Sequence, residues 1–591
     1  MATRVLTTLA GFAALGLLVA AVAGATNPDV LVSKGSPASP FSQNKQNEPA
    51  IAVDANHPNV LVAGANDNID LEACNAGRDD TCPFTEGVGV SGVYFSFDEG
   101  TTWIQPTYSG WSARNCLGVV GNNDPLCQPQ VGPIGTLPKY YENGLVSDGD
   151  PAVAFGPVPD AQGHFSWANG SRLYYANLTA NFSAVRSEEA FKGFEAVAVS
   201  RLDAPASTGL TPTIVANEDN WKKPVIVTKQ NAVLFSDKEQ AWADNAASSP
   251  FFGNVYVCNA AFRSLSGGRA SPLPVTVSVS SDGGDTWTTK QVTPAAANVQ
   301  RGFRQGCTIR TDSHGVVYVF DTHFAAGTPG LGAHTMVKSF DGGHTWTRPV
   351  DIFGMNDACF RVDPVIGRCV EDGIAGARND LTAMPSVDIA NGAPTGADAT
   401  NEIVDAWGDG RDGLNHEHVM VSYSTNGGTT WSTPTAVESA GDRAYYAAPA
   451  LSPNGSDLYI VYNAFLTQFR EDTSSPRILE GVVLHADIGA GGTPTGWAEL
   501  HRSPPGDPRG SSQNNLQAEF LGDYVYAVAT RTYGAAVWND TRNAADCPAM
   551  DAWRMSLRTG ATVPKPAPQQ DCPATFGNSD IFGGSYLDPT P

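Results

Sequence analysis

The octapeptide SFDGGHTW, residues 339–346, is the strongest fold signal in the chain, because its pattern occurs four times. The other copies are SFDEGTTW at residues 96–103, SSDGGDTW at 280–287 and STNGGTTW at 424–431. Each copy follows an alternating, strand-like run and ends in Thr-Trp before a second short run, which is typical of a β-hairpin. Asp341 can accept hydrogen bonds from turn amides, and Gly343 supplies a backbone angle that a side chain resists. The octapeptide therefore indicates a folding device, and a catalytic role for its Asp is not expected.

The composition indicates an all-β chain that does not bind nucleic acid. Its 591 residues include 60 acidic and 36 basic side chains, which gives a formal net charge of -24 at pH 7. Such an anionic protein is repelled by nucleic acid and by anionic membrane surfaces. Charged residues make up 16% of the chain, whereas 61 Gly, 41 Pro and 12 Trp indicate the many turns of an all-β fold.

Residues 1–25 predict a cleaved secretion signal. A single basic residue, Arg4, precedes an apolar run, and small residues including Ala23 and Ala25 follow that run. A membrane anchor is the alternative, but the apolar run is short for a span. Since no later segment is apolar enough to cross a bilayer, we expect a secreted protein, extracellular or periplasmic, with no membrane contact after signal removal.

All ten cysteines follow the predicted signal, and an even count in an exported protein predicts disulfides. Pairing of sequence neighbours leaves one longer bridge, although spacing alone does not prove connectivity. The pairs expected on this basis are Cys74–Cys82, Cys116–Cys127, Cys359–Cys369, Cys547–Cys572 and Cys258–Cys307. Metal binding is the rival interpretation, but no CxxC pair or His-rich cluster accompanies these cysteines, so the sequence predicts no metal site and no cofactor.

The pattern S-x-D-x-G-x-T-W resembles the Asp box, or bacterial neuraminidase repeat, of the sialidase superfamily. This resemblance covers most of the chain after the signal and implies a β-propeller. It also implies that the Asp boxes lie on outer-strand turns, on the side of the propeller away from the active site. The boxes identify an architecture and leave the chemistry open.

A second repeat, in which a strand, a turn and a second strand follow one another, predicts the number of blades. Seven such starts suggest seven blades, and six blades, the number in sialidases, is the alternative. The starts align on Asp54, Gly156, Asp244, Asp312, Ala390, Asn454 and Thr530. The run DVLVSKG, residues 29–35, is expected to complete the last blade and leave no free edge. Residues 26–591 thus form one predicted propeller domain with loop insertions and a Pro-rich tail after Leu557 that wraps the surface.

The starts of inner strands and the ends of second strands are predicted to meet at one mouth of the central channel, in a ring of carboxylates. Glycoside cleavage needs a proton donor and a second group, nucleophile or base, across the bond. Sialidases use a Tyr nucleophile assisted by a carboxylate, an Asp acid/base on an early loop and three Arg that hold the substrate carboxylate. On this basis the candidate catalytic residues are Asp67, Asp70, Glu48, Asp523 and Tyr524. The candidate substrate-binding residues are Arg411, Arg542, Asp237 and Asp409.

Each candidate also has a structural interpretation. A carboxylate at a strand end more often caps a turn than transfers protons. Tyr445 and Tyr446 compete with Tyr524 as the candidate nucleophile, and Tyr524 can instead pack in a blade. Arg411 and Arg542 share a Trp-x-Asp-x-Arg pattern, so a structural salt link is the alternative for at least one of them. The sequence Asn47-Glu48-Pro49 stands where sialidases carry Arg-Ile-Pro, so the first clamp Arg is missing.

The sequence therefore predicts a secreted, sialidase-like glycoside hydrolase that removes sialic acid or another terminal sugar from a glycan or glycoconjugate. A non-catalytic propeller that binds a glycan or a protein is the first alternative, because one fold hosts many functions. A sugar lyase on the same fold is the second alternative.

Overall fold

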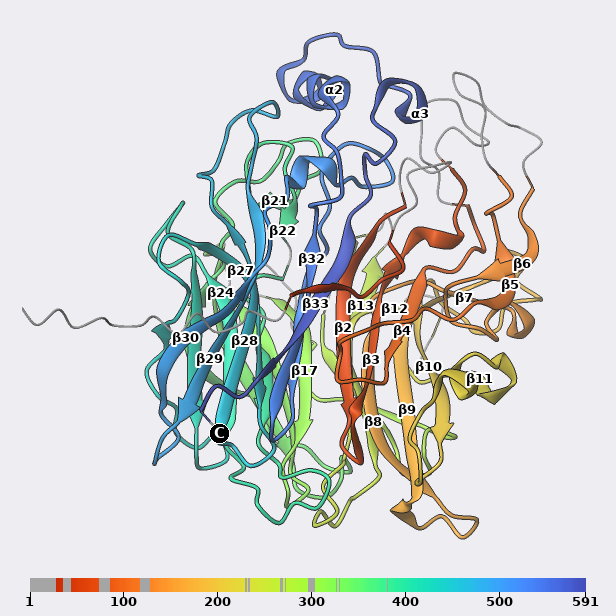
Figure 1. Cartoon of the computed structure of the whole chain (residues 1–591), viewed down its shortest axis with the longest axis vertical. Helices are drawn as coiled ribbons and strands as arrows, with labels where there is room; N and C mark the ends of the chain where they lie inside the picture. Colours follow the sequence, from red (N-terminus) through yellow and green to blue (C-terminus); the bar gives the residue numbers. More distant parts are fainter. Residues whose placement is uncertain are drawn as a thin grey trace, which may run out of the picture.

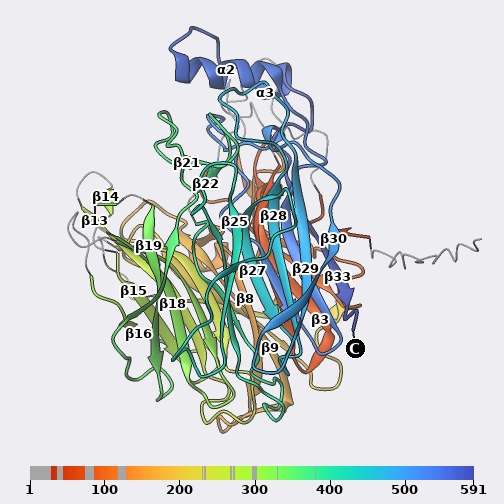
Figure 2. The ribbon, with the colours of Figure 1, turned by 90° about the vertical axis from the view of Figure 1, so that its left-hand side faces the viewer.

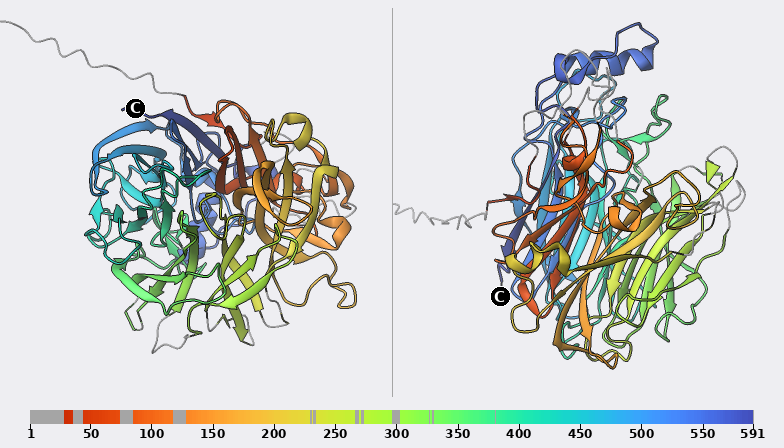
Figure 3. Two further views of the ribbon diagram at one scale, coloured as in Figure 1. Left: turned by 90° about the horizontal axis from the view of Figure 1, so that it is seen from below. Right: turned by 90° about the vertical axis from the view of Figure 1, so that its right-hand side faces the viewer.

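A computed structural model describes residues 28–590 except 36–43, 74–84, 117–127, 229–230, 232–233, 266–268, 271–272, 296–302, 326, 329 and 380. The predicted signal, residues 1–25, lies outside the described residues. Within the described chain, seven antiparallel sheets radiate as blades around one axis (Figures 1 and 3). The prediction of an all-β, seven-bladed propeller is confirmed.

Each blade runs from an innermost strand at the axis to an outermost strand at the surface. Blade 1 has β2 (Gln46–Asp54), β3 (His57–Asp67) and β4 (Ser91–Ser96). Blade 2 has β8 (Ala152–Pro159), β9 (Phe165–Asn181), β10 (Ala196–Ala204) and β11 (Trp221–Ile226), with β7 (Leu145–Ser147) also on β9. Blade 3 has β12 (Leu234–Ala243), β13 (Val255–Leu265), β15 (Val275–Ser280) and β16 (Thr288–Gln291), with β14 (Arg269–Ala270) also on β13. Blade 4 has β17 (Phe303–Thr311), β18 (Val317–Phe324), β19 (Leu331–Ser339) and β20 (Val350–Asn356).

The remaining blades follow the same order. Blade 5 has β23 (Ser386–Ile389), β24 (Ile403–Asp409), β25 (His418–Ser424) and β26 (Thr435–Ala436). Blade 6 has β27 (Arg443–Leu451), β28 (Asp457–Phe465), β29 (Leu479–Ile488) and β30 (Pro494–Arg502). Blade 7 has β31 (Tyr526–Ala529), β32 (Tyr533–Asp540), β33 (Asp580–Leu587) and β1 (Val30–Leu31).

The first and last strands of the ring pair with each other, as predicted. Val30 of β1 lies opposite Gly583 of β33 in an antiparallel ladder, so blade 7 takes its outermost strand from the start of the described chain. The expectation that the tail after Leu557 wraps the surface is wrong for residues 580–587. They form β33, the third strand of blade 7, which pairs with β32.

The predicted blade starts fall at the first turn of each blade, with Gly156 lying slightly earlier, inside β8. The four octapeptides lie at the third turns of their blades. Because neighbouring strands are antiparallel, the first and third turns lie at the same end of the propeller. The Ser and Asp side chains of an octapeptide bond within its turn: Gly343 N donates to Ser339 Oγ at 2.8 Å and Thr345 N donates to Asp341 Oδ1 at 2.7 Å. Asn426 makes the equivalent bond from Thr430 N at 2.9 Å, so an amide can replace the carboxylate.

Insertions gather at the opposite end of the propeller (Figures 1 and 2). They include the hairpin of β21 (Cys369–Val370) and β22 (Arg378–Asn379) and the helices α2 (Pro548–Thr559) and α3 (Pro568–Asp571). We call this the capped end and the end with the first turns the turn end. Further elements are β5 (Tyr108–Ser112), β6 (Gln130–Ile134), α1 (Pro212–Val215) and the short helices η1 (Asn68–Asp70), η2 (Tyr141–Asn143), η3 (Glu218–Asn220) and η4 (Pro508–Gly510). Among the described residues, no helix has both the length and the apolar character needed to span a membrane.

Helix α2 holds one of the insertions in place. The guanidinium of Arg554 is fully buried and donates to the carbonyl oxygens of Leu516 and Ala518 at 3.0 Å each. These bonds hold the segment that leads to Phe520, whose ring contacts the guanidinium of Arg378 at the capped end.

Three of the five expected disulfides are confirmed: Cys258–Cys307, Cys359–Cys369 and Cys547–Cys572. The other two expected pairs involve Cys74, Cys82 and Cys127, which lie outside the described residues. The bridge with a sequence separation of 49 joins β13 of blade 3 to β17 of blade 4, whereas the other two bridges stabilise insertions at the capped end.

Candidate active site

Several inner strands are interrupted by a bulge near the capped end. The register shifts between Asn47 and Ala50 in β2 and between Asp237 and Gln240 in β12. β17 and β27 have equivalent shifts. Glu48 and Lys238 occupy the bulges with φ values of 56° and 57°, a left-handed conformation that residues with side chains rarely adopt. Strained backbone of this kind clusters at functional sites, so the bulges indicate a candidate site at this level of the channel.

The ammonium of Lys238 is the centre of this site. Its Nζ lies 2.9 Å from Asp523 Oδ2, 3.2 Å from Asp150 Oδ2 and 3.6 Å from Asp237 Oδ1. These carboxylates come from blades 7, 2 and 3, so the contacts join distant parts of the chain across the axis. With Glu48 and Arg378 they form what we call the Lys238 cluster.

Arg378 enters the cluster from an insertion. It begins β22, and its Nη2 lies 3.3 Å from Asp523 Oδ2 and 4.0 Å from Glu48 Oε1. The ring of Phe520 covers its guanidinium, with 4.3 Å between Cζ and the ring centroid. A cation that lies on an aromatic face and beside two carboxylates is held in one orientation.

Glu48 lies at the buried side of the cluster. Its Oε2 accepts a hydrogen bond from Asn66 Nδ2 at 2.6 Å, and its backbone N donates to Asn539 Oδ1 at 2.9 Å. Burial, together with the negative charges of Asp150 and Asp523, raises the pKa of the Glu48 carboxyl well above its usual value. Glu48 is therefore the member of the cluster that holds a proton most readily.

The three carboxylates around Lys238 have different pKa values. Burial raises the pKa of Asp237 to about 6, against the opposing effect of Lys238. Burial also acts on Asp523, but Arg378 and Lys238 overcome it and lower its pKa to about 2. The pKa of Asp150 is lowered too, because Lys238 outweighs the cost of burial. Near pH 6 the cluster thus contains one carboxyl that exchanges its proton beside two that stay ionised.

Solvent reaches the cluster from one side. The side chains of Asp237 and Arg378 are each 19% exposed and that of Asp150 is 11% exposed, whereas Asp523 is fully buried. A ligand that approaches the cluster therefore meets Asp237, Asp150 and Arg378 first. Asp523 serves to hold the two cations.

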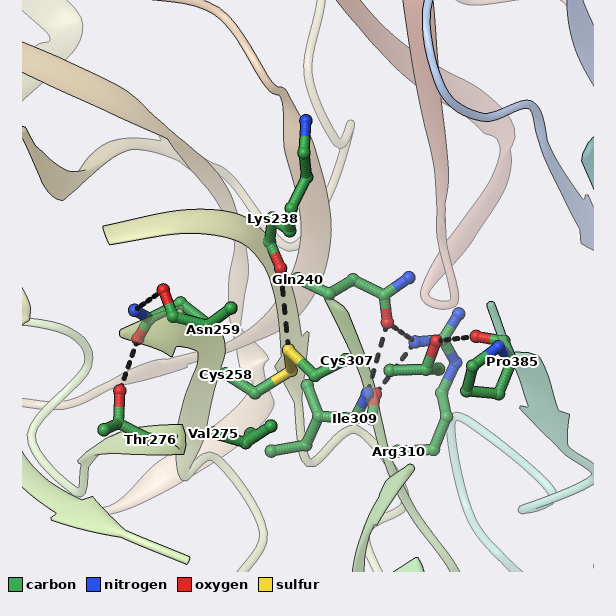
Figure 4. Close-up of a disulfide and its surroundings, with 12 residues drawn as sticks. Lys238, Gln240, Cys258, Asn259, Val275, Thr276, Cys307, Ile309, Arg310 and Pro385 are labelled. Carbon is green, nitrogen blue, oxygen red and sulfur yellow. Dashed lines mark hydrogen bonds between the residues drawn. A yellow bond between two sulfur atoms is a disulfide. The ribbon is translucent and has the colours of Figure 1, made fainter. Parts of the chain in front are cut away.

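The disulfide between blades 3 and 4 supports the Lys238 bulge. Figure 4 shows the carbonyl oxygen of Lys238 directed at Cys307, with 3.7 Å between that oxygen and Sγ. Because Cys307 is bonded to Cys258 of β13, the bulge lies against a covalent link between blades 3 and 4. The bridge restricts the freedom of β12 at the residue that gathers the carboxylates.

Of the predicted site residues, the structure brings together Glu48, Asp237 and Asp523. Tyr524 lies close to them, and burial, followed by the charges of Asp150 and Glu48, raises the pKa of its hydroxyl well above the usual value. Tyr524 therefore stands beside the cluster as a protonated phenol. Its ring is 5.5 Å from that of Tyr526, the next residue on the same face of the strand.

Asp67 and Asp70 do not join the cluster. Asp67 is buried and accepts hydrogen bonds from Gln46 Nε2, Tyr94 Oη and Gln105 Nε2, each at 2.8 Å. Asp70 is buried as well, 2.7 Å from Arg114 Nη2, and accepts a hydrogen bond from Thr136 Oγ1 at 2.6 Å. Both carboxylates are thus occupied, Asp70 by residues of the insertion between β4 and β7 and Asp67 by strand residues together with Gln105 of that insertion.

Arg411 and Arg542, expected to bind substrate, each bind the Asp two residues earlier. Arg411 Nη2 lies 2.8 Å from Asp409 Oδ2, and Arg542 Nη2 lies 2.6 Å from Asp540 Oδ2. Arg542 also lies 2.6 Å from Asp29 Oδ2, next to β1. The same geometry in blades 5 and 7 matches the alternative interpretation, a structural salt link.

Sequence reasoning did not identify Lys238 as the central residue, nor the part played by Arg378. The Asp237-Lys238-Glu239 triplet is the available signal for Lys238, since a cation between two acids at an inner-strand start is unusual. Nothing in the sequence around Arg378 indicates its position.

One group of possible metal ligands lies away from the cluster, within the described residues. It consists of His485 and the carboxylates Asp457, Asp487 and Asp588, whose ligand atoms all lie within 4.8 Å of one another. His485 Nε2 is 3.2 Å from Asp457 Oδ1, so a hydrogen bond within the group accounts for part of this proximity.

Comparisons with known proteins found only solved structures of low similarity. No family model and no curated protein matches the chain. Among solved structures, the Hadza microbial sialidase Hz136 is 14% identical over 71% of this chain and 64% of that one, with a TM-score of 0.38. A leech intramolecular trans-sialidase is 12% identical over 73% and 67%, with a TM-score of 0.38. An alpha-L-arabinofuranosidase, Arb93A, from Fusarium graminearum is 12% identical over 76% and 94%, with a TM-score of 0.37.

The chain thus spans 64% of the length of Hz136, slightly less than two thirds. At such identities and TM-scores the likeness says nothing about chemistry. What the site can do follows from the residues of this chain.

Proposed function

We propose that the protein is a glycoside hydrolase and that the Lys238 cluster is its active site. The observation that carries this proposal is the group of three carboxylates that share the Lys238 ammonium while their pKa values differ. Glycosidases need that combination, a carboxyl that can give a proton and a carboxylate that stays ionised.

Asp237 has the properties of the general acid. With a pKa of about 6 it is protonated in mildly acidic solution, and it is among the exposed members of the cluster. Asp150 has the properties of the second group, because Lys238 keeps it ionised. In this role Asp150 acts as nucleophile or as base towards water, while Asp237 protonates the leaving oxygen.

We infer that the substrate ends in an uncharged sugar. Arg411 and Arg542 are each bonded to a neighbouring Asp, and Arg378 is bonded to Asp523, so these arginines do not form a clamp for a sugar carboxylate. The net charge of -24 also disfavours an anionic substrate such as sialic acid. Hydroxyl groups of a neutral sugar are suitable donors to Asp150 and acceptors from Arg378.

Secretion belongs to the same proposal. It is supported by the three disulfides, which form and persist in oxidising compartments, and by the signal-like residues 1–25. A glycan outside the cell is the partner that such a location makes available.

The test is release of sugar from a panel of neutral and sialylated glycans, measured by mass spectrometry. We expect the wild type to release a neutral terminal sugar and Asp237→Asn to lower kcat/KM by about 10²–10⁴, the usual contribution of a general acid. Asp203→Asn is the matched control, since Asp203 is also paired, with Arg172, but in blade 2 away from the cluster. If the wild type releases no sugar from any glycan, or if the two variants behave alike, the proposal is wrong and the binding propeller takes its place.

A further inference from the structure

Between the Lys238 cluster and the turn end, which we call its lower half, the axial channel is hollow. A cavity of about 260 Å³ occupies its lower half, lined by residues of all seven inner strands. Pro58 and Arg531, both exposed residues of first turns, lie at its rim, so the cavity opens at the turn end. Nothing in the proposed hydrolysis uses this space.

The wall of the cavity is mainly apolar. Besides larger apolar side chains, Ala50, Ala152, Ala241 and Ala527 line it. An apolar lining around free volume suits an apolar ligand.

The end of the cavity that carries Arg310 is polar. The guanidinium of Arg310 stacks on Trp242, with 4.6 Å between Cζ and the ring centroid. Its Nη1 donates to Gln240 Oε1 at 2.6 Å and to the Ile309 carbonyl at 2.8 Å (Figure 4). Among the described residues, its Nη2 has no hydrogen-bond partner, so that nitrogen's two N–H groups remain available.

Tyr526 supplies a second donor beside Arg310. Its Oη accepts a hydrogen bond from Gln240 Nε2 at 3.0 Å, and the described residues offer its own proton no acceptor. Gln240 therefore fixes both groups, Arg310 through its oxygen and Tyr526 through its nitrogen. Two donors from the inner strands of blades 4 and 7 are thus held by Gln240 of blade 3 at the end of an apolar cavity.

The charge at this end is already balanced. Asp388 Oδ1 lies 3.4 Å from Arg310 Nε, and Asp388 Oδ2 accepts a hydrogen bond from Leu451 N at 2.8 Å. A further anion would meet a neutral ion pair inside a protein that carries a net charge of -24. An uncharged acceptor, a carbonyl oxygen, satisfies the two donors without that penalty.

We propose that the lower half of the channel binds a small, uncharged amphipathic molecule, with its carbonyl oxygen at Arg310 and Tyr526 and its alkyl body along the alanines. An apolar cavity of about 150 Å³ takes up benzene, so this one accommodates about ten non-hydrogen atoms. The site faces the turn end and is separate from the Lys238 cluster. Its occupant enters from the side opposite to the proposed glycan.

The experiment is titration of the whole protein with 2-octanone, followed by ligand-observed NMR and calorimetry. We expect saturable binding, weakened about 3- to 10-fold by Tyr526→Phe, which removes one hydrogen bond and keeps the ring. Tyr174→Phe is the matched control: it removes a buried hydroxyl from blade 2 that has no hydrogen-bond partner in the described residues, and we expect unchanged affinity.

Ala527→Phe tests the location, because a phenyl ring at that position fills the cavity and should abolish binding. Circular dichroism melting of each variant shows whether it is folded. Binding that survives Ala527→Phe in a folded protein overturns the assigned site. Tighter binding of octanoate than of 2-octanone overturns the uncharged class of ligand, and equal affinity of the wild type and Tyr526→Phe overturns the assigned donor.

Discussion

The two halves of the axial channel lie along the same ring of inner strands, but they differ in polarity and in free volume. In the capped half, the carboxyl side chains of Glu48 and Asp150 fill the axis. Two residues further along β2 and β8, Ala50 and Ala152 leave the axis hollow. The contrast shows that a propeller does not determine the character of its channel. The residue types at successive inward-facing positions do, and a bulge between them lets one strand serve both halves.

Strand β12 illustrates the point best. Lys238 lies in the bulge and gathers carboxylates, whereas Gln240, two residues later, orients the donors of the hollow half. Substitutions that act on one half alone test how independent the two halves are, beginning with those expected to cost the most stability.

Lys238→Met should cause the largest loss of stability. It removes the cation shared by three carboxylates of which one is fully buried, and breaking such a buried pair costs about 3–5 kcal/mol. The free energy of unfolding from urea denaturation is the measurement. Lys222→Met is the matched control, because Lys222 pairs with Asp203 while its side chain is 38% exposed, and a loss below about 1 kcal/mol is expected there. Equal losses of unfolding free energy in both variants would show that Lys238 contributes no more to stability than a lysine at the surface.

Replacement of both Cys258 and Cys307 by Ser should have the next largest effect. The bridge closes a loop with a sequence separation of 49, for which loop-closure entropy predicts a contribution of about 4 kcal/mol. Since Cys307 also lies against the Lys238 carbonyl, sugar release should fall as well. The comparison variant lacks Cys359 and Cys369, whose separation is 10, and a smaller loss of stability is expected from it. A larger effect from the short loop would contradict this account of the bridge.

The pH dependence of sugar release should follow Asp237. Because its pKa is raised to about 6, Asp237 stays protonated in the folded protein between pH 3.8, its ordinary pKa, and about pH 6. As pH rises through 6 the acid is lost, and kcat/KM should fall about tenfold per pH unit. For the same reason the stability contributed by the protonated carboxyl is present at low pH and decreases between pH 3.8 and about 6. Binding of 2-octanone should not change over this range, and a parallel change would couple the two halves.

Ala527→Leu should have the smallest effect. Ala527 lines the cavity and is half-buried, so added methyl groups enter free space and the stability should change by less than about 1 kcal/mol. Ala196→Leu is the contrast, since Ala196 is fully buried in a packed blade and overpacking costs about 1–3 kcal/mol. Thermal melting of the two variants measures the difference, and equal destabilisation would mean that the lower half is not hollow in solution.

Much of the fold could be predicted because its signals are local. The octapeptide specifies its own turn through Ser339, Asp341 and Gly343, and the strand periodicity around Asp54 and Asp312 marks first turns without reference to other blades. Ring closure by residues 29–35 followed from the need to leave no free edge. The role of the tail was missed, because nothing in residues 580–587 themselves shows which strand they complete.

The site was harder to predict, because its contacts cross the axis. Register alone placed Glu48, Asp237 and Asp523 near one mouth. A bulge changes which side a residue faces, so alternation could not identify Lys238, and Arg378 belongs to a two-residue strand of an insertion. Asp67 and Asp70 were expected at the site as ends of β3. Their partners Gln105, Arg114 and Thr136 come from an insertion whose path no periodicity records.

The pairing of β1 with β33 has a consequence for the order of events during synthesis. Val30 can pair only after Gly583 has been made, so blade 7 cannot form until nearly the whole described chain has emerged. Contacts of such long sequence separation form late and slow folding, and until then the apolar face of blade 1 that packs on blade 7, with Leu61 and Tyr94, stays exposed to other chains. Chaperones that shield this face should therefore raise the yield of folded protein.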